Sequence, residues 1–303
     1  MARAYHYMER PGFKSKIYRL LIRVMGIKTK LEKEFRTGDF SKAHKAARIP
    51  DKVKSQCDIQ YRQSPNGRTI WELKKKNTTP QRFLLFLHGG GFAHNITKYD
   101  WIFLNKITQQ TGLGIVVPDY PLVPTNNHHD VFDMVVPVYK DLLQHKGNEN
   151  VVLMGFSAGG GLTLSLAQYA LNNQLAQPAQ IILLSPLLDA TLQDPEIWTI
   201  DKYDPYIDIP GFKKAISAYA ANTSTDNYII SPIFGPLEGL APIHLFAGTH
   251  EVLLPDARKL VALAKKKSVP LNYYEYNEMY HAWIFFNMPE AKTVFNQLMQ
   301  ILK

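Results

Sequence analysis

The 303-residue sequence contains a single cysteine, Cys57, so no disulfide can form within the chain. It has no Cys-x-x-Cys pair and no cluster of cysteines and histidines, and nothing in it predicts a structural metal site. No apolar run approaches the roughly 18 residues that a membrane span requires. A signal-peptide core is also lacking, because arginines interrupt the apolar segment 18–27. These absences together predict a cytoplasmic protein.

Acidic residues are scarce only near the N-terminus. Residues 1–50 contain 13 Lys/Arg and 4 Asp/Glu, whereas the other 253 residues contain 22 of each. The net charge of +9 therefore belongs to an N-terminal arm, and the body of the chain is electrically balanced. A nucleic-acid-binding protein would have a basic surface on its body, so nucleic acid is not expected as a partner.

Apolar and basic residues of this arm recur at helical spacing. The apolar positions are Ile17, Leu20, Leu21, Val24 and Met25, and the cations between them are Lys16, Arg19 and Arg23. Such a helix could bury its apolar stripe on the body as a cap, or lie on an anionic membrane surface. We expect the cap, with residues 1–54 as a basic helical cap segment and a second helix over 37–49. Weak membrane contact is the alternative.

Short apolar segments recur through the body, with helical segments between most of them. The eight expected strands are 58–62, 69–73, 82–87, 114–120, 151–156, 181–184, 243–248 and 271–276. The expected helices of the body are 130–144, 162–171, 255–267 and 290–302. This alternation predicts a mostly parallel eight-stranded sheet with helices on both faces. Residues 190–236 do not continue this alternation of strands and helices, which indicates a helical lid insertion.

Segment 151–161 carries the first chemical signal. A short apolar run predicts a buried strand, and Gly155-Phe156-Ser157-Ala158-Gly159 follows it just before the next expected helix. A Gly-x-Ser-x-Gly turn between strand and helix strains the serine backbone and projects its hydroxyl at the carboxyl edge of the sheet. Ser157 is therefore the candidate nucleophile.

A run of glycines gives the second signal. His88-Gly89-Gly90-Gly91-Phe92 follows the strand expected over 82–87. Without side chains in the way, backbone amides in such a loop can turn inward and stabilise the oxyanion that forms during ester cleavage. A dinucleotide-binding loop is not indicated, because the Gly-x-Gly-x-x-Gly spacing is absent.

A serine nucleophile needs a general base, and the base needs an acid that orients it. Only three histidines follow Ser157 in the chain. His244 lies within an expected strand. In this fold the acid comes before the base in the chain, but His250 precedes the candidate acid. His281 comes just after the last expected strand, in a loop at the correct edge of the sheet, and is the expected base.

The acid should follow a late strand and precede the histidine. Glu251 comes three residues after Gly248, where a strand is expected to end, and is the preferred candidate. Asp256, inside the next expected helix, and Asp189, after the preceding strand, are the alternatives.

These motifs together resemble the hormone-sensitive-lipase-like family of α/β-hydrolases. The matching segments are 88–92, 155–160, Asp119-Tyr120-x-Leu122-x-Pro124, Ser231-Pro232, Gly248-x-x-Glu251-x-Leu253 and His281. The resemblance covers residues 55–303. It implies an α/β-hydrolase fold with an N-terminal cap and carboxylesterase activity, usually on short acyl chains.

The family's roles can be carried over residue by residue. They make Ser157 the nucleophile, His281 the base and Glu251 the acid, and they make the amides of Gly90, Gly91 and Ala158 the oxyanion hole. The chain departs from the family at Phe156 and Glu251, since aspartate is commoner at both positions. The domain prediction is a cap over 1–54 and a catalytic domain over 55–303, with 190–236 as a second cap or lid insertion.

Aromatic residues next to the motifs are candidates for binding an apolar substrate or for the core. They are Phe92, Tyr99, Trp101, Phe156 and Trp283, of which Phe92, Phe156 and Trp283 are the preferred pocket residues. His128-His129-Asp130 with Asp133 could be read as a metal cluster, but adjacent histidines at a helix start are usually solvated. We expect neither a metal nor a cofactor.

The expected function is hydrolysis of a small carboxylic ester by a Ser-His-Glu triad, through an acyl-enzyme intermediate. An amidase or formamidase would use the same residues. A membrane-associated lipase is a further alternative, because of the basic arm. A non-catalytic ligand-binding protein is disfavoured, since all three triad residue types are present. Homodimer formation is left open.

Overall fold

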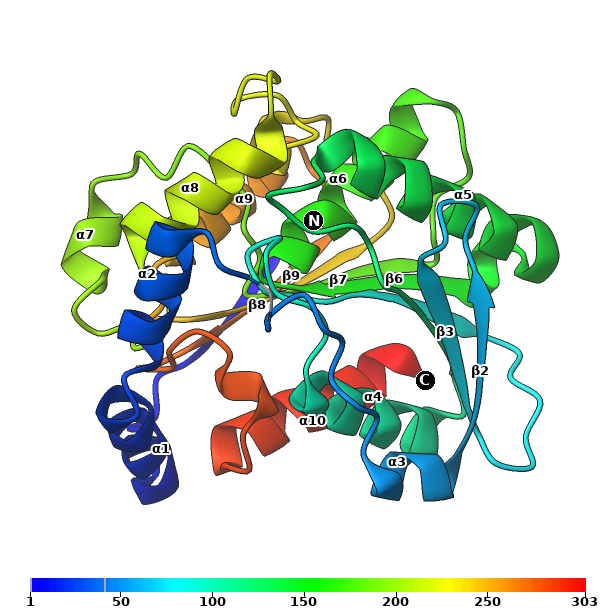
Figure 1. The fold of residues 1–303 in the computed structure, drawn as a ribbon, viewed down its shortest axis with the longest axis horizontal. Helices are drawn as coiled ribbons and strands as arrows, with labels where there is room; N and C mark the ends of the chain where they lie inside the picture. The colour runs from blue at the N-terminus through cyan, green and yellow to red at the C-terminus, as the bar shows by residue number, and fades with distance from the viewer. Residues whose placement is uncertain (1, 41) are drawn as a thin grey trace.

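The computed structural model describes residues 2–40 and 42–303 and contains one nine-stranded sheet between two layers of helices (Figure 1). The strands are β1 (Arg3–Tyr7), β2 (Cys57–Gln63), β3 (Thr69–Lys75), β4 (Phe83–Leu87), β5 (Gly114–Pro118), β6 (Val151–Phe156), β7 (Gln180–Leu184), β8 (Ile243–Gly248) and β9 (Leu271–Tyr276). Their order in the sheet is β1-β9-β8-β7-β6-β4-β5-β3-β2. Neighbours are parallel except at β2–β3 and β3–β5, which are antiparallel. The predicted α/β-hydrolase architecture is confirmed.

Helices cover both faces of the sheet. They are α1 (Phe13–Val24), α2 (Ile27–Thr37), α3 (Asp51–Gln56), α4 (Lys98–Thr111), α5 (His128–Lys146), α6 (Ala158–Asn172), α7 (Glu196–Ile200), α8 (Ile209–Ala220), α9 (Leu254–Lys266) and α10 (Pro289–Leu302). Helices α5, α6 and α9 lie on one face, and α3, α4 and α10 lie on the other (Figure 1). Short 3₁₀ turns complete the elements at Asn148–Asn150, Pro232–Phe234 and Trp283–Phe285.

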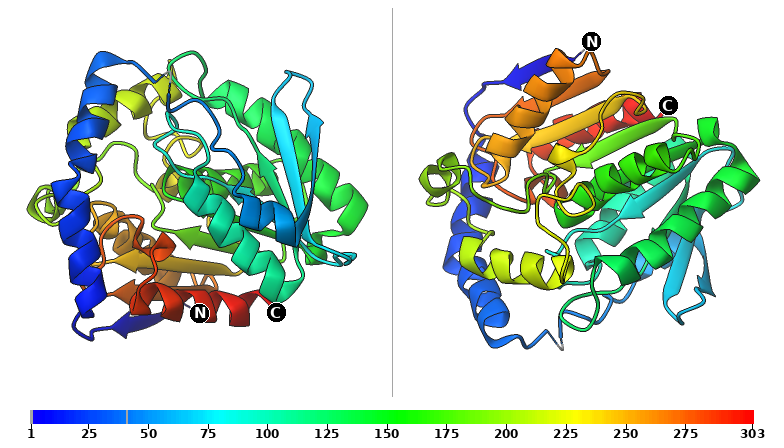
Figure 2. Two further views of the ribbon diagram at one scale, coloured as in Figure 1. Left: turned by 60° about the horizontal axis from the view of Figure 1, so that its bottom comes forward. Right: turned by 90° about the horizontal axis from the view of Figure 1, so that it is seen from above.

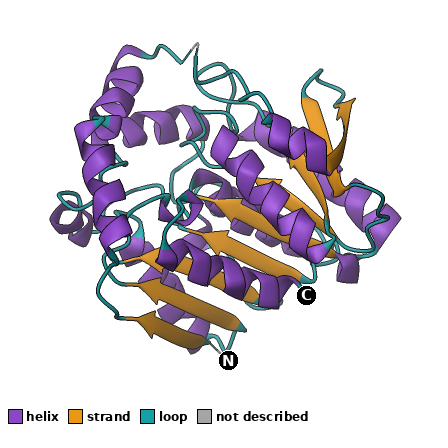
Figure 3. Ribbon diagram, turned by 90° about the horizontal axis from the view of Figure 1, so that it is seen from below, coloured by secondary structure: helices purple, strands orange, loops and turns teal. Residues whose placement is uncertain are grey.

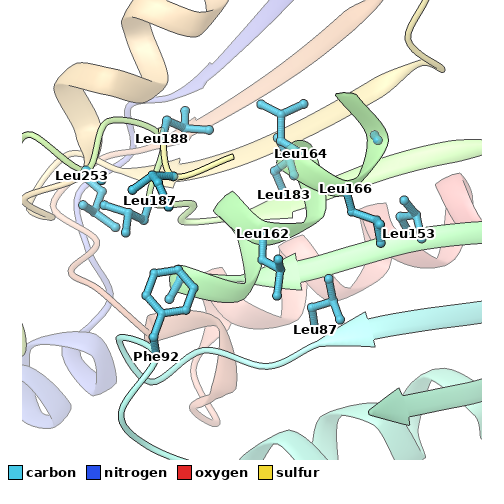
Figure 4. Packing of buried hydrophobic residues seen from close by; sticks show 14 of the residues in the cluster. Leu87, Phe92, Leu153, Leu162, Leu164, Leu166, Leu183, Leu187, Leu188 and Leu253 are labelled. Atoms are coloured by element: carbon cyan, nitrogen blue, oxygen red, sulfur yellow. The ribbon is translucent and has the colours of Figure 1, made fainter. Parts of the chain in front are cut away.

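The central strands are buried because helices cover them on both sides. All six residues of β6 and of β8 are buried, and alternate side chains enter the two cores. Figure 4 shows one of these cores, in which leucines from β4, β6 and β7 pack against Leu162 and Leu166 of α6. The continuous apolar runs of the sequence reflect this two-sided burial.

The first strand corrects the expected strand number from eight to nine. Residues of β1 pair in parallel with β9, so the start of the arm extends the sheet instead of belonging to a cap. Tyr7 stacks on Tyr276 at a ring-centroid separation of 4.4 Å. Most β1 side chains are exposed, and the segment therefore lacks the apolar pattern that identifies a strand from sequence.

The two cap helices also differ from the prediction. The second helix is α2, which ends at Thr37, and no helix covers the described residues of 38–49. The apolar stripe of the first helix was expected to be buried, but Ile17, Leu20, Leu21 and Val24 of α1 are exposed. Ser15 and Ile22, on the opposite side of α1, are the buried residues.

Helices α1 and α2 form a column beside the ends of the sheet (Figure 2, left). The arrowheads of the parallel strands point toward this column (Figure 3). Helix α2 packs against α8, which belongs to the segment 190–236. That segment contains α7, α8 and a 3₁₀ turn but no strand, as expected. Among the residues that the structure describes, no helix is long and apolar enough to cross a bilayer.

Candidate active site

Ser157 occupies the sharp turn between β6 and α6. Its φ of 56° is a strained value for a residue with a side chain. The flanking glycines make the turn possible, because a Cβ on Gly155 would collide with the Gly159 carbonyl, and one on Gly159 with the Leu87 carbonyl. The turn places Ser157 at the carboxyl end of β6, as the motif predicts.

His281 and Glu251 lie beside this serine. The Oγ of Ser157 is 2.9 Å from Nε2 of His281, and Nδ1 of His281 is 3.2 Å from Oε2 of Glu251. All three residues are buried or nearly so. The backbone N–H of Gly248 donates to the other carboxylate oxygen of Glu251 at 2.7 Å, which fixes its orientation. The fold therefore brings the three sequence candidates into one hydrogen-bonded chain.

The two alternative acids lie elsewhere in the structure. Asp256 is in the first turn of α9, and no hydrogen bond joins it or Asp189 to His281 within residues 2–40 and 42–303. Asp189 instead caps its own loop by accepting from the Thr191 N–H at 2.9 Å. Burial, and then the Asp189 carboxylate, raises the pKa of Asp256 from 3.8 to about 7. The geometry therefore selects Glu251 as the carboxylate next to the imidazole.

The raised pKa of Asp256 gives a testable pH dependence. Between about pH 4 and pH 7 the native state binds a proton that the unfolded state has released, so stability falls as pH rises. The variant Asp256→Asn removes this loss. We expect it to raise the free energy of unfolding at about pH 8, by up to about 4 kcal/mol, and to change it little at about pH 4. Urea unfolding at both pH values measures this, and an equal effect at both would contradict it.

Two glycines that follow β4 line the same cavity as Ser157. Gly90 has a φ of 113° and Gly91 a φ of 62°, both in the region that favours glycine. In the described part of the chain, the backbone N–H groups of Gly90, Gly91 and Ala158 donate no hydrogen bond to a protein acceptor. Ala158 is the first residue of α6, where helix N–H groups have no intrahelical partner. These amides are available to a ligand.

A cavity of about 390 Å³ opens onto Ser157 and His281. Much of its lining is apolar and comes from the two helices of the column and from segment 206–212. The apolar lining residues are Ile22, Met25, Ile27, Leu31, Phe35, Tyr99, Phe156, Tyr206, Ile207, Phe212, Ala282, Phe285 and Phe286. Two lining carboxylates, Asp100 and Asp208, are engaged as helix caps. Most of the polar side-chain groups of the lining that are free to contact a ligand therefore belong to Ser157 and His281.

The three preferred aromatic residues have different positions. Phe156 lines the cavity, and its ring stacks on the His281 imidazole at 5.0 Å. Phe92 instead stacks on Tyr219 and packs beside the buried leucines of Figure 4, and it does not line the cavity. Trp283 is fully buried in the other core. Of these three, only Phe156 can contact a ligand directly in this structure.

Sequence reasoning missed Asp204. Its buried carboxylate accepts from the Val252 N–H at 3.0 Å and the Tyr206 N–H at 2.9 Å. It therefore ties the lid segment to the residue that follows Glu251. Burial raises the pKa of the Asp204 carboxyl. The only signal for this role in the sequence is an aspartate in a polar, aromatic segment, because its two partners come from different segments.

The other histidines that the sequence analysis weighed lie outside the Ser157–His281–Glu251 chain. His250 lies 2.9 Å from an Arg19 nitrogen, and His244 is buried within β8. His128 contacts the Tyr219 carbonyl and the Thr223 hydroxyl, so it belongs to the packing of α5 against the lid segment. Across the described residues, no three His, Cys, Asp or Glu side chains are grouped as metal ligands.

Comparison with known proteins gives concordant results. A family model described as alpha/beta hydrolase fold matches residues 84–285. An esterase of Acinetobacter venetianus is 27% identical over 222 residues, which cover 72% of this chain and 73% of the relative. An acetyl-hydrolase of Streptomyces hygroscopicus is 28% identical over 214 residues, which cover 70% and 72%. The crystal structure of an esterase from the bacterial hormone-sensitive lipase family shares the fold, with a TM-score of 0.82, 22% identity and coverage of 97% and 98%.

Proposed function

The chain belongs to the α/β-hydrolase fold family, and from this premise we propose that it cleaves short-acyl carboxylic esters with Ser157, His281 and Glu251. The family resemblance inferred from the motifs is confirmed, and the chain is an esterase/lipase-type hydrolase. The observation that carries the proposal is the 2.9 Å separation between Ser157 Oγ and His281 Nε2, with Glu251 on the other ring nitrogen.

Acylation begins with the serine hydroxyl. The carboxylate of Glu251 accepts a hydrogen bond from Nδ1–H of His281, which leaves Nε2 as the proton acceptor. His281 takes the Ser157 proton as Oγ attacks the ester carbonyl carbon, and Glu251 stabilises the imidazolium. The imidazolium then protonates the leaving alcohol, and the acyl group remains on Ser157.

The oxyanion of the tetrahedral intermediate needs preorganised donors. The free N–H groups of Gly90, Gly91 and Ala158 are the proposed oxyanion hole. The Ala158 amide also lies at the N-terminus of α6, where the helix dipole favours negative charge. A water molecule activated by His281 then attacks the acyl-enzyme and releases the carboxylic acid.

Two segments make up the proposed cap. Helices α1 and α2, together with the lid segment 190–236, supply the cavity residues that face Ser157 from above the sheet edge. The catalytic domain is then the remainder of 55–303, with β1 added to its sheet. Because both cap segments line the cavity, their side chains set which ester can enter.

Cavity size supports a preference for short acyl groups. A volume of about 390 Å³ lies near the lower end of the range for small-molecule sites, and it must also hold the alcohol of the ester. The similarity to an acetyl-hydrolase is in agreement. We expect kcat/KM for p-nitrophenyl esters to be highest for acetate or butyrate and to fall by about tenfold or more at palmitate. A rise toward palmitate would contradict the preference.

The same assay tests the proposed reaction. If the folded protein hydrolyses none of these esters, the esterase assignment for this chain is overturned. An aryl formamide should be turned over more slowly than p-nitrophenyl acetate, since its leaving group is poorer. Faster turnover of the formamide would instead identify an amidase with the same residues.

A further inference from the structure

Helix α1 presents its apolar side to solvent. Phe13, Leu20 and Val24 are 78%, 62% and 76% exposed, and Ile17 between them is also exposed. Because they are three or four residues apart, these side chains form one face of the helix. The face turned toward the protein contains Ser15 and Ile22, which are buried. This orientation is the reverse of that of an ordinary surface helix.

Contacts on the inner side hold the helix in this orientation. The backbone N–H of Gly12 and the hydroxyl of Ser15 both donate to the carboxylate of Glu290 in α10, at 2.7 and 2.5 Å. Arg19, on the same side, forms an ion pair with Glu278 at 3.5 Å. The exposed apolar face is therefore fixed by specific partners on the body.

Cations flank the apolar face. At 100° per residue, Lys14 lies along one side of it, and Lys16 and Arg23 lie along the other. Residues 10–31 contain seven Lys/Arg and no Asp/Glu. Neither Lys14 nor Lys16 forms an ion pair with any described residue of the chain. An apolar stripe with unpaired cations on both sides matches the interior and the headgroups of an anionic bilayer.

From this arrangement we propose that α1 is a docking element for an anionic phospholipid surface. The apolar face made by Phe13, Ile17, Leu20 and Val24 would enter the headgroup–acyl boundary, and Lys14 and Lys16 would contact lipid phosphates. A second copy of the chain is the poorer occupant, because pairing two α1 faces would bring their cation rows together without acidic partners.

Docking would place the cavity mouth at the lipid surface. Met25, next to the exposed face, and Ile22, on the inner face, both line the cavity that leads to Ser157. An ester dissolved in the membrane could therefore reach the serine along α1 without crossing bulk water. The surface attachment itself does not depend on the esterase proposal, and its test can be separated from catalysis.

Sedimentation of the full chain with vesicles tests the docking. Phosphatidylcholine vesicles containing phosphatidylserine should bind the protein at low salt, and pure phosphatidylcholine vesicles should bind it at least about tenfold more weakly. The variant Leu20→Ser/Val24→Ser should weaken binding by about tenfold or more, and Lys14→Glu/Lys16→Glu should do the same. The exposed pair Lys75→Glu/Lys76→Glu changes the charge equally on another surface and should leave binding within about twofold.

Hydrolysis of water-soluble p-nitrophenyl acetate by each variant, without vesicles, separates docking from catalysis. This rate should stay within about twofold of wild type, because none of the substituted residues lines the cavity. The proposal is overturned if the wild type does not bind the mixed vesicles, or if the lysine control weakens binding as much as the α1 variants. If the wild type self-associates without lipid and Leu20→Ser/Val24→Ser abolishes this, the lipid proposal is also overturned, because the occupant of the α1 face is then a second copy of the chain.

Discussion

The variant Ser157→Ala is expected to lower kcat for ester hydrolysis by about 10⁴-fold or more. The alanine removes the only hydroxyl within hydrogen-bond distance of Nε2 of His281 among the residues described, so no acyl-enzyme can form. Labelling by a fluorophosphonate probe should disappear together with turnover. His281→Ala should lose nearly as much activity, because the two residues act as a unit and their losses are not additive.

A matched control exists at the end of the neighbouring strand. Ser185 follows β7, is buried and also has a positive φ, but no hydrogen bond joins its hydroxyl to His281 within the described chain. Ser185→Ala should therefore keep its fluorophosphonate labelling and most of its turnover. Labelling that persists in Ser157→Ala, with native circular dichroism, would rule out Ser157 as the nucleophile.

The variant Glu251→Gln is expected to reduce kcat/KM by about 10³–10⁴-fold. A glutamine has nearly the same shape and can still accept the Gly248 N–H through its oxygen. Its NH₂ group would then face Nδ1 and favour the tautomer that carries the proton on Nε2. That tautomer cannot accept the proton of Ser157, and a neutral amide stabilises the imidazolium less well than a carboxylate.

The alternative acids provide the controls for this variant. Asp256→Asn and Asp189→Asn should each change kcat/KM by less than about threefold, because neither carboxylate contacts His281. A loss at Asp256→Asn larger than that at Glu251→Gln would show that the acid had been assigned to the wrong residue. Measured kcat and KM should also separate, with most of the Glu251→Gln loss in kcat.

The arrangement of Ser157, His281 and Glu251 was predictable because each follows a segment that the sequence pattern predicts to be a strand. Parallel strands place their carboxyl ends at one edge of the sheet, so residues far apart in the chain meet there. The length of the turn also matters, since only two residues separate Gly248 from Glu251, and the carboxylate therefore reaches the last amide of its own strand. Their catalytic roles stay a prediction until the variants are measured.

The cavity walls were not predictable in the same way. Phe35 and Phe212 come from α2 and α8, helices of two segments far apart in the chain that the tertiary structure packs together. Phe92 and Trp283, chosen because they adjoin motifs, belong to the cores. Adjacency in sequence to a catalytic motif does not fix the direction of a side chain, which depends on the local φ and ψ. Asp204 was missed for the same reason, since its partners are backbone amides of two segments.

The strand–turn–helix around Ser157, the order of the site residues and the family can all be read from local patterns of apolar residues and glycines in the sequence. Two further features depend on long-range packing: Arg3–Tyr7 adds a strand beside β9, and α1 turns its apolar face outward. An amphipathic pattern identifies a helix and its two faces, but it does not say which face meets the protein. Here that choice came from Glu290 and Glu278, which bind the polar side of α1 from the other end of the chain.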